Sequence, residues 1–432
     1  MKKTLLKLLV GTSALMMLAA CGNQPKEDTQ STDKTSEGEI TAWAWDPKFN
    51  IAALELAEET YQKENNDFKL NVIENAQDDI VQKLNTGLSS GNMKGLPNIV
   101  LIEDYRAKSF LDAFPDAFFP LTDFITASDF IPYKIEATST DNVNYAIPFD
   151  TGVTGLFLRK PIIEKAGLTV DDFENITWEE FITLGKQVKE KTGLPMFSTD
   201  LNDTGLVRAI MQSSGSWYTL EDGATPNFEN NESLINAFEL MKKMLDEGVM
   251  ITHNGWDQML SNFNDGKVAT TLNGNWITPS VKAEADQAGE WVVKPFPRQA
   301  DVKGATNASN LGGSSFYVLN VDGKEEAAKF ISETFGNDQA FYQRLIKEVG
   351  ALGSYEPASS GEAYKAKDEF FGGQTVYTDF SNWATEIPAV NFGKNTYAFG
   401  DIGNNALQDF LGGKDINTVM KDAQKTAETQ VK

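Results

Sequence analysis

The sequence predicts an α/β protein with two lobes, because strand and helix patterns alternate along most of its 432 residues. The predicted strands are short and apolar, as strands buried within a parallel sheet are. Glycines follow the predicted helices at the positions where helices commonly end. A body of about 390 ordered residues buries roughly three quarters of its unfolded surface, which is enough for two separate hydrophobic cores.

The first twenty residues are expected to be a secretory signal peptide. Lysines precede an apolar run from Leu8 to Ala20, which is too short to span a membrane. The ending Leu18-Ala19-Ala20-Cys21-Gly22 matches the lipobox of bacterial lipoproteins, whose cysteine is acylated with fatty acids such as palmitate. We therefore expect residues 1–20 to be removed, Cys21 to be the lipidation site and residues 21–38 to form a flexible linker. The alternative is that Cys21 stands beside a cleavage site by chance.

Composition limits the classes of function. The net charge of −24 repels nucleic acid and anionic lipid, so we expect no nucleic-acid partner and membrane contact through the lipid anchor only. The single cysteine allows no intramolecular disulfide, and a single histidine, His253, argues against a transition-metal site. We expect no metal, no cofactor and a monomer, with His253 in a loop at the surface.

The N-terminal third is expected to alternate between strand and helix. A strand at 40–45 points Trp43 and Trp45 to the same face, and Asp46-Pro47 then turns the chain. A helix at 51–61, a strand at 68–73, a helix at 78–91 and a wholly apolar strand at 98–102 follow.

The same alternation continues to the C-terminus. A capping box, Thr177-Trp178-Glu179-Glu180, opens a helix that Gly193 ends. We also expect strands at 145–149, 153–158 and 268–272, and helices at 231–247, 257–265, 325–335 and 338–349, with a polar helix after Gly412-Gly413.

Tryptophans at predicted strand ends and in loops suggest a sugar site. A sugar ring has an apolar C–H face and a rim of hydroxyls, so its site needs aromatic platforms beside carboxylates or amides. The sequence puts these types together at Trp45-Asp46, Glu103-Asp104-Tyr105, Phe149-Asp150 and Asn273-Gly274-Asn275-Trp276. Each has a structural alternative, since tryptophan on a strand is often core and aspartate before proline is ordinary turn chemistry. We expect Trp178, Trp256 and Trp291 to be structural.

Four stretches together resemble the family 1 extracellular solute-binding proteins of ABC transporters, which include the maltose/maltodextrin-binding proteins. They are Ala146 to Gly152 with the continuation to Leu168, Thr177 to Phe181, Phe263 to Trp276, and Asn310 to Ser315. The resemblance covers nearly all of residues 39–430. It implies a two-lobed periplasmic-binding-protein-like fold (type II), with a ligand cleft between lobes joined by three crossing segments.

Matching the chain to that plan places the crossings near Pro148–Thr151, near Asn310 and near Gly350–Ser354. Lobe one is then 39–148 plus 310–350, and lobe two is 149–309 plus 351–432. The resemblance implies capture of a sugar or oligosaccharide by hinge closure and delivery to the ABC permease subunits. The stretch from Ile387 to Tyr397 also resembles a ligand-lining segment. The ligand-binding residues that the resemblance implies are Trp45, Asp46, Asp104, Tyr105, Asp150, Trp217, Asn275, Trp276, Gly313 and Trp383.

Other functions stay open. A secreted glycoside hydrolase needs two carboxyl groups at a defined separation, and with 62 acidic residues a pair can always be imagined. No motif for a Ser or Cys nucleophile with a His base is visible, so we expect no catalytic residues. A peptide or an organic anion is a second alternative ligand, and an adhesive surface protein is a third possibility. An anion would favour converging arginines, whereas the arginines are scattered through the sequence, at Arg106, Arg159, Arg208, Arg298 and Arg344.

Overall fold

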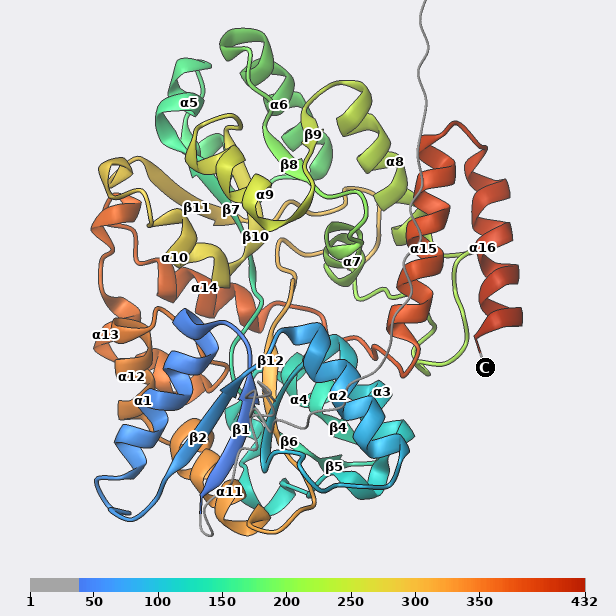
Figure 1. Cartoon of the computed structure of the whole chain (residues 1–432). Helices are drawn as coiled ribbons and strands as arrows, with labels where there is room; N and C mark the ends of the chain where they lie inside the picture. Colours follow the sequence, from blue (N-terminus) through green and yellow to red (C-terminus); the bar gives the residue numbers. More distant parts are fainter. Residues whose placement is uncertain (1–38, 432) are drawn as a thin grey trace, which may run out of the picture. The chain divides into compact units, whose positions relative to one another are not determined.

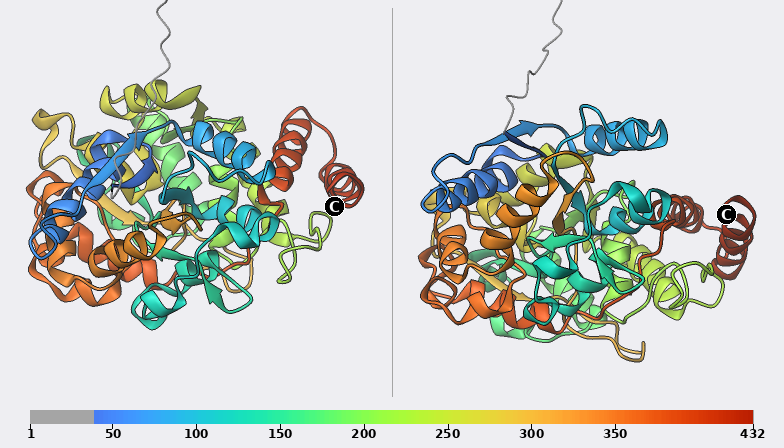
Figure 2. Two further views of the ribbon diagram at one scale, coloured as in Figure 1. Left: turned by 60° about the horizontal axis from the view of Figure 1, so that its bottom comes forward. Right: turned by 90° about the horizontal axis from the view of Figure 1, so that it is seen from below.

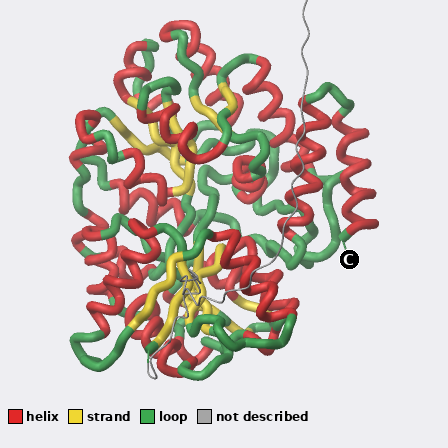
Figure 3. The backbone as a smooth tube through the Cα atoms, viewed as in Figure 1, coloured by secondary structure: helices red, strands yellow, loops and turns green. Residues whose placement is uncertain are grey.

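The structure is a computed structural model that describes residues 39–431. The expected signal peptide, the lipidation site at Cys21 and the linker lie outside these residues. Within the described part, the strands gather mainly into two sheets, and helices surround each of them (Figures 1 and 3). The predicted α/β class is therefore confirmed. No described helix is both long enough and apolar enough to cross a membrane.

The first sheet has five strands in the order β2-β1-β3-β12-β6. β1 runs parallel to β2 and β3, whereas β12 runs antiparallel to β3 and β6. All residues of β1 and β12 are buried, including the two serines that begin β12. The strands are β1 (Ile40–Ala44), β2 (Leu70–Glu74), β3 (Ile99–Glu103), β6 (Ala146–Pro148) and β12 (Ser314–Val318).

The second sheet has three strands in the order β10-β7-β11, with both outer strands antiparallel to β7. β10 starts at Thr270, two residues later than the sequence predicts, and continues to Gly274. The strands of this sheet and of the two small ladders are β7 (Thr154–Arg159), β10 (Thr270–Gly274), β11 (Trp291–Pro295), β4 (Ser139–Thr140), β5 (Val143–Asn144), β8 (Phe197–Thr199) and β9 (Met250–Thr252).

Local signals set the helix ends closely. Thr177 and Glu180 form the predicted capping box at the start of α6, and Gly193 ends this helix in the left-handed conformation with φ 79°. The helices are α1 (Ala52–Tyr61), α2 (Gln77–Ser89), α3 (Asp104–Ala113), α4 (Pro132–Thr138), α5 (Lys160–Lys165), α6 (Trp178–Thr192), α7 (Gly205–Gln212), α8 (Glu232–Asp246), α9 (Gly255–Asn264), α10 (Thr278–Val281), α11 (Lys324–Ile331), α12 (Gln339–Glu348), α13 (Glu362–Lys365), α14 (Val376–Thr385), α15 (Thr396–Leu411) and α16 (Ile416–Gln430).

Three segments pass between the two sheets and are hydrogen-bonded to one another. Ser354 N donates to Phe149 O at 2.9 Å, and Thr151 N donates to Leu352 O at 3.1 Å. Leu311 N donates to Gly152 O at 2.7 Å. We call these segments the first (149–153), second (309–313) and third (350–354) crossings. They lie at the positions that the sequence analysis assigns to crossings.

Hydrophobic packing continues across the predicted lobe boundary. One buried cluster contains Ile40 and Phe316 of the first sheet together with Phe157 and Trp291 of the second. Residues of α12, α13 and α14 connect the two ends of this cluster. The lobe limits at 148/149 and 350/351 therefore stay a prediction.

The last two helices pack against each other at one edge of the described structure (Figure 2). α15 also contacts α3, which follows the central strand β3 of the first sheet. The C-terminal part of the chain thereby reaches residues that are nearly 300 positions earlier, and this contact forms part of the site described next.

Candidate functional site

A buried polar network holds the first and second crossings in place. The Lys134 ammonium donates to Asp104 Oδ2 at 2.6 Å and to Ser314 O at 2.8 Å. Ser315 Oγ donates to the other oxygen of Asp104 at 2.9 Å. Asp150 Oδ1 accepts bonds from both N and Oγ of Ser314, each at 2.7 Å. Asp104 and Asp150, two predicted site residues, thus hold the start of β12 where it leaves the second crossing.

Burial changes the acidity of both carboxyl groups. Burial raises the pKa of Asp150 to about 6, against the opposing effects of the Lys134 ammonium and the Ser314 hydrogen bonds. Burial also raises the pKa of Asp104, and the ammonium of Lys134 opposes that rise. Two carboxyl groups that face one ammonium titrate as a unit.

Gly313 lies at the point where this network meets the second crossing. Its φ of +89° favours glycine, and a Cβ there would lie 3.0 Å from Asp104 Oδ2 and 3.2 Å from Gly152 N. Its carbonyl also accepts a hydrogen bond of 3.1 Å from Asp104 N at the start of α3. Gly313 therefore allows the close approach of the crossings, and a larger residue would displace one of them.

Two further predicted residues, Tyr105 and Trp217, stack on each other in the protein interior. Their ring centroids are 5.6 Å apart, and the two residues are 1% and 3% exposed. Tyr105 OH donates to Asn310 O of the second crossing at 3.0 Å, and Trp217 Nε1 donates to Thr396 Oγ1 at 3.1 Å. The Arg208 guanidinium lies 4.8 Å from the centre of the Tyr105 ring. This stack therefore joins α3, α7 and the start of α15.

Tyr397 of α15 meets charged residues that follow β3. Its hydroxyl hydrogen-bonds to the Glu103 carboxylate, and the Arg106 guanidinium lies 3.6 Å from the centre of its ring. Burial raises the pKa of Glu103, although the Arg208 guanidinium and the Tyr397 hydroxyl oppose the rise. Trp45, which follows β1 and is half-buried, lines a small hollow together with Glu103 and Arg106. Carboxylate, guanidinium, phenol and indole groups are thus adjacent at this end of the first sheet.

Trp276, in the short helix that follows β10, also contacts the second crossing. Its indole N–H donates to Leu311 O at 2.7 Å, two residues before the Gly313 carbonyl that accepts from Asp104. Trp276 is partly exposed and stacks on Trp256, with ring centroids 5.9 Å apart and an interplanar angle of 27°. Trp276 therefore contacts the second crossing at Leu311, two residues before Gly313, whose carbonyl contacts Asp104.

The interpretation of Trp256 as structural is wrong. Trp256 is 50% exposed in the first turn of α9, and its ring stacks on Trp276. Trp178 and Trp291 are 0% exposed, so the structural interpretation of these two tryptophans is confirmed.

The remaining predicted residues differ in their surroundings. Asp46 is exposed at φ 57°, and its carboxylate accepts a bond from Lys48 N at 3.1 Å. Asn275 is 3% exposed and lies beside Thr151 of the first crossing, with Thr151 Oγ1 3.4 Å from Asn275 Oδ1. Trp383 of α14 packs on Phe380 and lines a separate cavity beside β11. Trp383 is therefore the predicted residue that lies apart from the others.

His253 is buried, so its prediction as a surface residue is wrong. It is 7% exposed, and its Nδ1 lies 2.9 Å from Ser198 Oγ on the neighbouring strand β8. Burial lowers the pKa of His253, which favours the neutral ring. In residues 39–431, no three His, Cys, Asp or Glu side chains gather as metal ligands.

Sequence reasoning did not select Glu103, Arg106, Arg208 or Trp256, and it named Tyr397 only as the end of a stretch. The arginines look scattered in the sequence, yet the Arg106 and Arg208 guanidinium groups lie 3.6 and 5.8 Å from the centre of the Tyr397 ring. Each already has an acidic neighbour, since Arg106 Nε is 3.8 Å from Glu103 and Arg208 is 3.6 Å from Asp203. One sequence signal could have identified this group: Glu103 and Arg106 stand three residues apart at the end of an apolar strand, where ligand-binding residues are common in α/β folds.

The family model of bacterial extracellular solute-binding proteins matches residues 57–372. The lactose-binding protein of Rhizobium radiobacter is 42% identical over 395 residues, which cover 91% of this chain and 93% of that protein. The arabinooligosaccharide-binding protein of Bacillus subtilis is 24% identical over 90% of this chain and 87% of its own length.

Solved structures agree in fold. The GacH receptor of Streptomyces glaucescens has a TM-score of 0.74 at 19% identity, covering 90% of this chain and 97% of that one. An ABC-transporter-associated binding protein of B. animalis subsp. lactis, solved with β-1,6-galactobiose, has a TM-score of 0.71 at 22% identity, covering 90% and 96%. The predicted two-lobed binding-protein fold is thereby confirmed. With its sequence matched over most of its length, the chain belongs to the bacterial extracellular solute-binding proteins.

Proposed function

We propose that this protein is the carbohydrate-binding component of an ABC importer, and that its cargo is lactose or a closely related β-galactoside. The observation that carries the proposal is the 42% identity to a lactose-binding protein over 91% of this chain. The stacked Trp256–Trp276 pair supports it, because sugar rings stack on indoles, and Glu103 and Arg106, at and just after the end of β3, supply charged groups of the kind that bond to sugar hydroxyls.

The proposed sugar site has two parts, one beside each sheet. Trp276 and Trp256 offer the aromatic platform from the side of the second sheet. Trp45, Glu103 and Arg106 offer an aromatic edge with hydroxyl-binding groups from the first sheet. In the open form, a disaccharide would contact one part only. Hinge closure would bring the second part against the sugar, and the added contacts would stabilise the closed form.

The buried candidates have a supporting role in this proposal. Asp104, Asp150 and Gly313 hold the crossings, and Tyr105 and Trp217 join α3 to α7 and α15. Crossings that are hydrogen-bonded to one another favour a change of angle between the sheets, which is the motion that a capture protein needs. Trp383 would then contribute little to sugar affinity.

The rest of the proposal concerns location and partners. Cys21 would carry acyl chains that hold the protein at the outer face of the cell membrane. The permease subunits would recognise the closed, sugar-loaded form and accept the sugar from it. We propose no catalysis for this chain, because the relatives are binding proteins of transport systems. An organic anion is less favoured, because Arg106 and Arg208 already have acidic neighbours.

Calorimetric titration of the purified protein tests the ligand, with lactose, β-1,6-galactobiose, maltose and an arabinooligosaccharide as the panel and tryptophan fluorescence in parallel. We expect saturable binding of lactose in the micromolar range or tighter, with a fluorescence change that Trp276→Ala abolishes. Binding of maltose in preference to both galactosides would discard the β-galactoside assignment. A response to peptides or organic anions and to no sugar would discard the carbohydrate function.

Two further measurements test the class and the anchor. Release of nitrophenol from a chromogenic β-galactoside by the purified protein would contradict the absence of catalysis. In cells, Cys21→Ala is expected to move the protein from the membrane fraction to the medium, and membrane retention of this variant would contradict the lipid anchor.

A further inference from the structure

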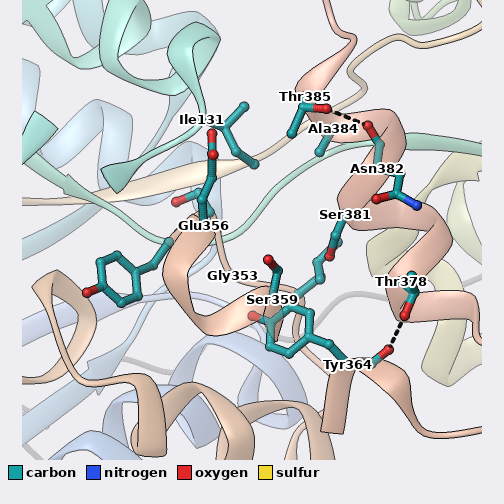
Figure 4. A pocket seen from close by; sticks show the side chains of 13 residues that line it. Ile131, Gly353, Glu356, Ser359, Tyr364, Thr378, Ser381, Asn382, Ala384 and Thr385 are labelled. Atoms are coloured by element: carbon teal, nitrogen blue, oxygen red, sulfur yellow. Dashed lines mark hydrogen bonds between the residues drawn. The ribbon is translucent and has the colours of Figure 1, made fainter. Parts of the chain in front are cut away.

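A cavity of about 160 Å³ lies against the third crossing, apart from the proposed sugar site (Figure 4). One water molecule needs about 10–15 Å³ of such space, so the cavity has room for a small organic molecule. Leu352, Gly353 and Ser354 of the crossing form one wall, and Ile131 adjoins them. α14 forms the opposite wall with Thr378, Ser381, Asn382, Ala384 and Thr385.

The two walls belong to different halves of the molecule. Ile131 N donates to Ser354 O at 3.2 Å, which ties the crossing to the start of α4 beside the first sheet. α14 instead packs on the second sheet, where the Phe380 and Phe157 rings are 5.9 Å apart. A change of angle between the sheets therefore changes the width of the cavity.

Several polar side chains that line the cavity have no partner within the described part of the protein. Within residues 39–431, the side chains of Glu356, Ser359 and Asn382 make no hydrogen bond or ion pair, and all three line the cavity. The hydroxyls of Thr378 and Thr385 donate to backbone carbonyls at 2.7 Å, which leaves their lone pairs free to accept. Glu356 and Asn382 are exposed to solvent, and the Glu356 carboxylate has no ion-pair partner among the described residues. An occupant that suits this set carries hydroxyl donors and a positive charge.

We propose that this cavity is a second ligand site, which takes a small hydroxylated ammonium compound and couples its binding to the hinge. The Glu356 carboxylate accepts from the ammonium group, and the Asn382 amide and Ser359 hydroxyl bond to the ligand hydroxyls. Because the third crossing is a wall of the site, a ligand that fits one hinge angle better shifts the hinge equilibrium. Only this coupling step rests on the proposed sugar-binding function.

The direct test compares 2-amino-1,3-propanediol with glycerol, which have the same skeleton and differ in the charged amine. Binding of each to the purified protein is measured by saturation-transfer NMR titration. We expect the amine to bind about two- to fivefold more tightly, the gain of one solvent-accessible charge contact. Glu356→Gln is expected to remove this preference. The matched control is Glu386→Gln, because Glu386 is an exposed carboxylate just after α14 and does not line the cavity. We expect the control to keep the preference for the amine.

Two results overturn the site: no binding of either compound, or an amine preference that survives in Glu356→Gln. Asn382→Ala adds a second check, because this amide has no hydrogen-bond partner within the described protein. We expect the variant to bind both compounds more weakly.

The coupling is tested by measuring lactose affinity with and without saturating 2-amino-1,3-propanediol. We expect a change of at least about threefold, with an equal change in amine affinity when lactose is present, because coupling between two sites is reciprocal. An unchanged lactose affinity overturns the coupling. If no sugar binds at all, the proposed function fails, and the comparison of amine with glycerol still decides the cavity.

Discussion

The Lys134 ammonium lies 2.6 Å from the Asp104 carboxylate, and both side chains are 0% exposed. Lys134 also donates to Ser314 O at 2.8 Å, so this single cation joins α4, the start of α3 and the start of β12. Ions are costly to bury, and this pair keeps its stability only while both partners are present. The pair therefore holds the second crossing at a fixed distance from the first sheet.

Removal of the Lys134 charge is expected to destabilise the protein strongly. Lys134→Met leaves Asp104 buried without its cation, which costs about 3–5 kcal/mol of the free energy of unfolding. Urea denaturation followed by tryptophan fluorescence measures the loss. Lys165→Met, at an exposed helix end, is the control and is expected to change stability by less than about 0.5 kcal/mol. Equal losses in the two variants would contradict this role of the pair.

Asp150 makes stability depend on pH. Its pKa is raised to about 6 in the folded protein, so the folded state holds this proton over a range in which the unfolded state releases it. Stability contributed by Asp150 therefore falls as pH rises from about 4 to about 6, by roughly 2–3 kcal/mol in total. Lys134 and Asp104 face the same space, and their coupling is part of this change.

Asp150→Asn tests this dependence, because an amide oxygen can still accept both Ser314 bonds. We expect the variant to match the wild type near pH 4 and to exceed its free energy of unfolding at pH 7. A wild type and variant with parallel stability profiles from pH 4 to pH 7 would show that Asp150 does not titrate in this range.

Gly313 is expected to tolerate no side chain. Gly313→Ala adds a Cβ that would lie 3.0 Å from Asp104 Oδ2, in addition to the strain of φ +89°. Gly413→Ala is a matched control, because Gly413 has φ +98° and no atom within 4 Å of the added Cβ. The control measures the backbone strain alone, about 1–2 kcal/mol. A larger loss of thermal stability in Gly313→Ala supports the close packing of the crossings, and equal losses would contradict it.

Trp256 and Trp276 are expected to contribute unequally to sugar affinity. Trp276→Ala removes the platform and its bond to Leu311, and we expect at least about a tenfold weaker lactose affinity, or 1.4 kcal/mol. Trp256→Ala removes the outer ring of the pair and should cost about two- to fivefold, whereas Trp256→Phe should retain most of the affinity. Calorimetric titration measures all three variants. Full lactose affinity in Trp276→Ala would remove this residue from the site.

Much of the secondary structure was predictable, because its signals are local. The capping box at Thr177, the left-handed Gly193 and the apolar run of β3 involve residues that are close in the sequence. Ends of strands were less predictable: β10 begins two residues late, because pairing with β7 decides which residues join the ladder.

The structure brings several of the predicted site segments together, and which of their residues bind the ligand stays a prediction. Sequence reasoning identified the segments around Asp104, Gly313 and Trp276, and the structure brings these segments together at the second crossing. It could not separate an exposed tryptophan from a buried one. Trp217 is covered by Tyr105, which is 112 positions away, whereas Trp256 stacks on Trp276 and stays 50% exposed.

The sequence by itself determined the α/β alternation, the positions expected for the crossings and the kinship with solute-binding proteins, because these depend on periodicity, caps and short motifs. The tertiary structure alone decided that Glu103, Arg106 and Tyr397 meet, that Lys134 lies between the crossings, and that a cavity adjoins the third crossing. Burial and charge pairing are properties of residues far apart in the chain, and only the folded backbone brings such residues into contact.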